Sequence, residues 1–102
     1  MSYRAAYCKK KTNIRVRPLH EMEICLVFTP DNPTLYSLNS TAWLIFELCD
    51  GRRLDELENA YYEVVEPLVS REDARREVGR GIEQLEHKGL IQWVSDTPPE
   101  TL

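Results

Sequence analysis

The sequence predicts an α+β domain in which a three-stranded antiparallel sheet is followed by three helices. Three observations favour this class. Alternating apolar and polar residues, rich in β-branched side chains, occupy the first third of the chain, as expected for strands. Apolar residues at three- and four-residue spacing follow from residue 40, as expected for helices. Clusters of proline, glycine, asparagine and aspartate separate these segments and mark turns and caps.

Three short strands account for the first part of the pattern. Residues 14–18 alternate apolar and charged side chains and end at a proline. Residues 23–29, with the sequence EICLVFT, are apolar and β-branched, and they run into the turn formers of residues 30–33. Residues 34–38 resume the extended pattern, so we predict that the last two strands form a hairpin.

Helix one is predicted over residues 40–50. Asn39 and Ser40 are both preferred N-cap residues, because their side-chain oxygen can accept a hydrogen bond from a free N–H of the first turn. Either residue can therefore begin the helix. Gly51 stands where a left-handed residue commonly ends one.

Two further helices follow. The second is predicted over residues 54–65, since Pro67 disfavours helical geometry at the residue before it. The third begins after Ser70, which has an acidic residue at capping-box spacing, and ends at Gly89. Residues 90–94 add a short terminal strand. Three strands and then three helices are typical of a winged helix-turn-helix domain.

Two glycines inside helix three need a reason. Each of Gly79 and Gly81 costs about 1 kcal/mol relative to alanine in a helix interior. A missing side chain lets another backbone come close, so one interpretation is a groove beside this helix. Close helix packing within the domain is the other, and the sequence does not decide between them.

We expect one folded domain over residues 13–94, with a flexible basic tail at residues 1–12 and a disordered tail at residues 95–102. Residues 1–17 hold six basic side chains and no acid, whereas residues 18–102 carry a net charge of −10. A chain of 102 residues is long enough for one core and too short for two.

Composition argues against a membrane protein and against a disulfide framework. The longest apolar run, residues 42–46, is far shorter than the roughly 20 residues that span a bilayer. No secretory signal is recognisable near the start, so we expect a cytoplasmic protein. The three cysteines lack the close spacing of zinc or iron–sulfur ligands, so no metal and no cofactor are expected.

No residue pattern points to catalysis. His20 and His87 are far apart, and no nucleophile or phosphate motif is present, so we expect a protein that is not an enzyme. A winged-helix DNA-binding regulator is the alternative, with phosphate or base contacts from the arginines of helix three: Arg71, Arg75, Arg76 and Arg80. Interleaved acids and the acidic body disfavour a polyanionic partner, so no nucleic acid is expected.

Four short motifs together resemble the PqqD family. They are Leu38-Asn39, Leu48-Cys49-Asp50-Gly51-Arg52-Arg53, Leu54-Asp55-Glu56-Leu57, and Ile82 with Leu85 and Gly89-Leu90-Ile91. Members of that family are small peptide chaperones, or precursor-peptide recognition elements, in pathways of ribosomally synthesised and modified peptides. The resemblance implies a winged-helix-like fold that does no chemistry itself. It implies a protein that binds the leader of a precursor peptide and presents it to a radical SAM maturase.

The resemblance also implies where the leader would bind. The leader would add a strand to the edge formed by Thr34, Leu35, Tyr36, Ser37 and Leu38. Helix three would supply the wall of the groove through Arg71, Arg75, Val78, Gly79 and Ile82. An open alternative is that Val78 and Ile82 belong to the core and that the arginines form a solvated face.

The sequence leaves open which modified peptide is the final product and whether the chain pairs with a second copy of itself. The N-terminal part of the chain departs from the members that serve pyrroloquinoline quinone synthesis, so the product is either that coenzyme or another modified peptide. A free strand edge can also pair with its own copy, which makes a homodimer an alternative use of residues 34–38.

Overall fold

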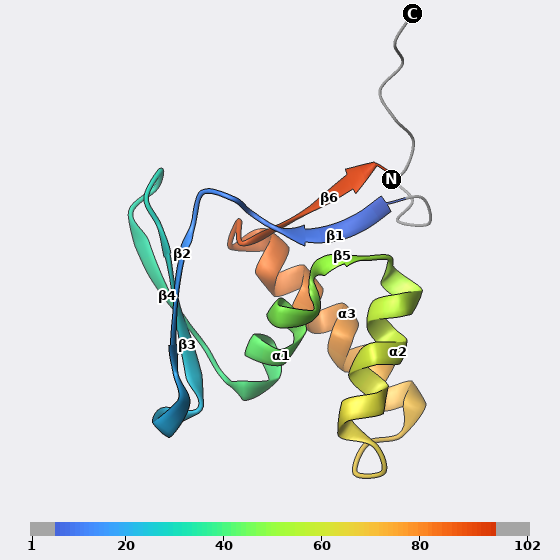
Figure 1. Ribbon diagram of the computed structural model, residues 1–102. Coiled ribbons are helices and arrows are strands. Elements are labelled where there is room, and N and C mark those ends of the chain that lie inside the picture. Colours follow the sequence, from blue (N-terminus) through green and yellow to red (C-terminus); the bar gives the residue numbers. More distant parts are fainter. Residues whose placement is uncertain (1–5, 96–102) are drawn as a thin grey trace, which may run out of the picture.

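The computed structural model describes residues 6–95, which form two small sheets and three helices (Figure 1). In chain order the elements are β1 (Ala6–Lys10), β2 (Arg15–Leu19), the 3-10 turn η2 (His20–Met22), β3 (Ile24–Thr29), β4 (Thr34–Leu38), α1 (Ser40–Leu48), β5 (Asp50–Arg52), α2 (Leu54–Val65), α3 (Arg71–His87) and β6 (Ile91–Ser95). The predicted α+β class is confirmed, with its three-stranded antiparallel sheet ahead of three helices. No helix among the described residues is long and apolar enough to cross a membrane.

The predicted meander is the sheet with strand order β2-β3-β4. Its hairpin pairs Thr29 with Thr34 and runs on to the pair of Cys25 with Leu38. Cys25, Val27 and Leu38 face the helices and are buried, which is the outcome expected when one face of an antiparallel sheet covers a core. In Figure 1 this sheet stands on one side of α1, and α2 lies on the other side.

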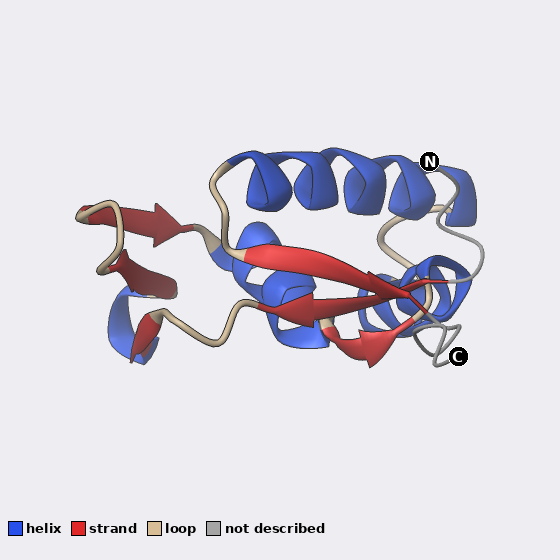
Figure 2. Ribbon diagram, turned by 90° about the horizontal axis from the view of Figure 1, so that it is seen from above, coloured by secondary structure: helices blue, strands red, loops and turns tan. Residues whose placement is uncertain are grey.

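A second sheet, with strand order β5-β1-β6, corrects the expected N-terminal tail. Residues 6–10 were expected to be flexible, but they form the central strand of this sheet, with Ala6 and Cys8 buried. The alternation of buried and more exposed side chains in this strand is short, and the lysines directly after Cys8 interrupt it, so the sequence did not predict a strand here. The predicted terminal strand is confirmed as β6, and Figure 2 shows the loop that leads from β1 to the other sheet. Residues 1–5 and 96–102 of the two expected tails lie outside the described part.

The helix starts follow the predicted capping chemistry. Asn39 is the N-cap of α1, and its side-chain oxygen accepts a hydrogen bond of 2.9 Å from the N–H of Ala42. Ser70 is the N-cap of α3, and its Oγ accepts from the N–H of Asp73 at 3.1 Å. Gly89 has a φ of +75° directly after α3, as the prediction of a left-handed end required.

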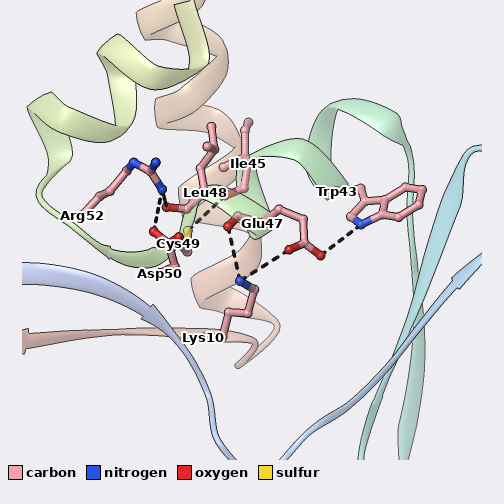
Figure 3. A network of polar contacts seen from close by, with 8 residues as sticks. All are labelled: Lys10, Trp43, Ile45, Glu47, Leu48, Cys49, Asp50 and Arg52. Carbon is pink, nitrogen blue, oxygen red and sulfur yellow. Dashed lines mark hydrogen bonds and ion pairs between the residues drawn. The ribbon is translucent and has the colours of Figure 1, made fainter. Parts of the chain in front are cut away.

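Helix α1 ends earlier than predicted, at Leu48 instead of residue 50, because side chains take over its last carbonyls (Figure 3). Gly51, with a φ of +103°, then lies in β5 and not at a helix end. Lysine and arginine at a helix C-terminus also complement the helix dipole. The three donor and acceptor pairs are Cys49 Sγ to Ile45 O at 3.2 Å, Lys10 Nζ to Glu47 O at 3.3 Å, and Arg52 Nη1 to Leu48 O at 3.1 Å.

The two glycines of α3 have different environments. A Cβ at Gly81 would lie 2.5 Å from Cδ1 of Ile45, a fully buried residue of α1, so Gly81 permits the two helices to pack closely. A Cβ at Gly79 would meet nothing within 4 Å. Close helix packing is therefore the reason for Gly81, and it is not the reason for Gly79.

A hydrogen bond between Tyr61 and Glu77 joins α2 to α3. The Tyr61 hydroxyl donates to Oε1 of Glu77 at 2.5 Å, and the ring of Tyr61 is buried in the core. Burial, together with the hydrogen bond to Glu77 and the charge of that carboxylate, raises the pKa of Tyr61 to about 12. The phenol therefore stays neutral throughout the physiological range.

Alanine at the two glycines should have opposite effects on stability. Gly79→Ala should increase the free energy of unfolding by about 1 kcal/mol, since it adds helix propensity in open space. Gly81→Ala should be less stable than Gly79→Ala by about 1 to 3 kcal/mol, because the methyl group displaces Ile45. Urea unfolding of both variants measures the difference. Equal effects at the two positions would contradict close packing at Gly81.

Above pH 10, the free energy of unfolding of the wild type should decline more steeply than that of the Tyr61→Phe variant. The pKa of Tyr61 is raised on folding, so its contribution is complete below its ordinary value of about 10 and is lost as the pH rises through 12. The loss in the free energy of unfolding should reach about 2 to 3 kcal/mol by pH 12. Unfolding curves of the wild type and of Tyr61→Phe between pH 9 and pH 12 give the comparison. Parallel pH profiles would show that folding does not change this pKa.

Candidate functional site

The edge strand β4 leaves one row of backbone groups without a strand partner. Among the described residues, β4 pairs with β3 on one side and with no strand on the other. Tyr36 and Leu38 point to the core side of the sheet, and Leu35 and Ser37 point outward. The predicted edge is therefore present, and it ends directly at Asn39, the N-cap of α1.

The C-terminal end of α3 lies near this strand. At one end, Nζ of Lys88 is 5.6 Å from the ring centroid of Tyr36. At the other end, a pocket of about 320 Å³ lies between α3 and the start of α1, and it begins at Asn39, the residue after β4. We call this region the β4–α3 groove, defined by the Tyr36 and Lys88 pair and by the pocket residues Asn39, Thr41, Ala42, Ile45, Glu77, Arg80, Gly81 and Gln84.

The groove has a polar wall from α3 and a buried base from α1. Glu77, Arg80, Gln84 and Lys88 are spaced by three or four residues and so share one flank of the helix. Glu77 accepts the hydrogen bond from Tyr61, which fixes its carboxylate. Arg80 is exposed and has no ion-pair partner among residues 6–95, so its guanidinium is free to bind an acidic group.

Arg71 and Arg75 do not line the groove, which corrects two of the predicted site residues. Nη1 of Arg71 donates to Oδ1 of Asn59 at 2.9 Å, and its guanidinium lies 4.4 Å from the ring centroid of Tyr62. Nε of Arg75 is 3.6 Å from Oε1 of Glu58. All three partners belong to α2, so both arginines face α2 and not β4.

Val78, Gly79 and Ile82 are also outside the groove. Val78 and Ile82 are buried in the core, which agrees with the alternative that the sequence left open. Gly79 is two residues from Gly81, or about 200° around the helix, and faces away from the pocket. Residue spacing in the sequence gave no information on which flank of α3 meets the sheet.

The wall residues that the prediction missed leave only a partial signal in the sequence, which is their helical spacing. Gly81 is the position in α3 that α1 approaches, so the polar residues on its side of the helix belong to the flank that faces the start of α1. Those residues repeat at helical spacing from Glu77 to Lys88. The contact with Ile45 identifies this flank, and it is available only from the structure.

No group of three or more histidine, cysteine, aspartate or glutamate side chains among residues 6–95 is arranged to hold a metal ion. The three cysteines are free and buried. Burial raises the pKa of the Cys25 thiol, and a hydrogen bond with Cys8 raises the pKa of the Cys49 thiol, so neither is a ready thiolate nucleophile.

Comparisons with known proteins agree with this architecture. The family model described as "Coenzyme PQQ synthesis protein D (PqqD)" matches residues 25–91, which is more than half of the chain. The fold is similar to that of a solved structure titled "TbiB1 in Complex with the TbiA(beta) Leader Peptide", with a TM-score of 0.68 and 19% sequence identity over 82% of this chain and 94% of that one. Curated protein sequences give no significant match. The chain belongs to the PqqD family.

Proposed function

We propose that this protein binds the leader of a ribosomally synthesised precursor peptide as an added strand on β4 and presents it to a radical SAM maturase. The observation that carries the proposal is the unpaired edge of β4 beside the β4–α3 groove. In this proposal the chain does no chemistry itself. The product is either pyrroloquinoline quinone or another modified peptide.

Strand addition would divide affinity and specificity between backbone and side chains. The exposed N–H and C=O groups of β4 set the register of the incoming strand. Each such hydrogen bond contributes only about 0.5 to 1.5 kcal/mol, so five residues of edge do not select a sequence. Alternate leader side chains then enter the β4–α3 groove, where Arg80 and Lys88 favour acidic groups.

The relatives support this proposal in two ways. The family name refers to the synthesis of coenzyme PQQ, and the structure with the similar fold contains TbiB1 together with a leader peptide. This chain has the same fold and an open strand edge. Its modifying enzyme and its precursor are part of the proposal, as is a location in the cytoplasm.

The arginines of α3 argue against the alternative of a DNA-binding regulator. Arg71, Arg75 and Arg76 are engaged with Asn59, Glu58 and Asp73, respectively. Of the four arginines predicted to contact DNA, only Arg80 lacks a partner among the described residues, and it lies in the groove. A phosphate backbone would have to compete with these contacts, which disfavours DNA as the ligand.

Filling the groove should weaken binding of the leader. Gln84→Trp places a large side chain in the β4–α3 groove and should reduce affinity at least tenfold, or by about 1.4 kcal/mol. The measurement is fluorescence anisotropy with labelled synthetic peptides that tile the short open reading frames beside the gene. Glu83→Trp is the matched control, because Glu83 is the exposed neighbour outside the pocket and should leave affinity unchanged.

Two results would count against the proposal. One is that no tiled peptide binds the wild-type protein. The other is equal affinity in Gln84→Trp and Glu83→Trp, which would mean that the bound peptide does not enter the groove. Thermal unfolding of both variants should match the wild type, since both positions are exposed.

A further inference from the structure

The outer face of the β2-β3-β4 sheet is apolar, although the helices cover only its inner face. Leu26 and Phe28 of β3 and Leu35 of β4 point away from the core and form a shallow depression of about 470 Å³. Leu35 is 62% exposed. The strand register places Arg15 opposite Phe28 and Arg17 opposite Leu26, so two arginines border the apolar residues on the β2 side. We call these five residues the outer face.

Charge restricts what can cover the outer face. Among residues 6–95 neither Arg15 nor Arg17 has an ion-pair partner, and residues 18–102 carry a net charge of −10. Two copies packed through this face would bring four arginines together, which disfavours a dimer there. A partner surface with an apolar centre and carboxylates at its border would complement both the apolar residues and the two arginines of the outer face.

The position of the outer face relates it to the peptide site. Leu35 belongs to β4, the strand whose edge is proposed to receive the leader, whereas the two arginines lie on β2 at the opposite edge of the same sheet. A partner on the outer face would therefore leave the β4 edge open. It would also lie beside the outward-pointing side chains of any strand added there.

We propose that the outer face is the docking surface for the enzyme that modifies the bound peptide, and that this enzyme contributes an apolar patch bordered by carboxylates. This inference rests on the proposed function. Apolar contacts of Leu26, Phe28 and Leu35 supply the buried centre of the interface. Arg15 and Arg17 form its charged border, which sets orientation and association rate.

The test measures two affinities for each variant: one for the labelled leader peptide and one for the purified modifying enzyme encoded beside the gene. The double variant Arg15→Glu/Arg17→Glu should weaken binding of the enzyme at least tenfold, or by about 1.4 kcal/mol, and leave affinity for the peptide unchanged. The wild-type complex should weaken as salt is added, and the double variant should lose most of that dependence. Lys9→Glu/Lys11→Glu is the matched control, because it makes the same charge change at exposed positions outside the outer face.

The outcomes separate this inference from the proposed function. Unchanged affinity for the enzyme in the arginine variant, or an equal loss in the lysine control, would overturn the docking surface while peptide binding stands. Absence of any enzyme binding to the wild type would also overturn it. Loss of dimerisation in the arginine variant alone would assign the outer face to a second copy. Failure of the wild type to bind any peptide would instead contradict the proposed function.

Discussion

The close approach of α1 and α3 at Gly81 positions the rest of the candidate site. Ile45 of α1 occupies the space that a side chain at position 81 would need. Because α1 follows β4 without an intervening loop beyond Asn39, the same contact fixes α3 relative to the strand. The polar flank of α3 is thereby held against the start of α1, where the free edge ends, and Lys88 lies beside Tyr36 of β4.

A second set of contacts keeps α1 in place from its other end. The last carbonyls of the helix accept hydrogen bonds from Lys10 on β1 and from Arg52 on β5 (Figure 3). These bonds connect the helix to the β5-β1-β6 sheet, whose central strand was expected to be a tail. The Asp50-Gly51-Arg52 segment of the family motif therefore has a structural role here. It ends the helix and anchors it.

The sequence predicted the elements far better than it predicted the site. The sequence was sufficient where an interaction joins residues a few positions apart, as at the N-caps Asn39 and Ser70. Strand β1 was missed because its pairing partners are more than 40 positions away in β5 and more than 80 positions away in β6, and a short alternation beside lysines carries little information on its own. The arginines of α3 were misplaced for a related reason. Helical spacing shows which residues share a face, but only tertiary contacts show what that face meets.

The direct test of strand addition is amide hydrogen exchange, with and without a saturating leader peptide. The two edge strands of one sheet provide an internal comparison, because β2 and β4 are both edges and only β4 borders the groove. We predict that the peptide slows exchange at the edge-facing amides of Thr34–Leu38 and leaves Arg15–Leu19 unchanged. Protection of β2, or binding without protection of β4, would contradict the account.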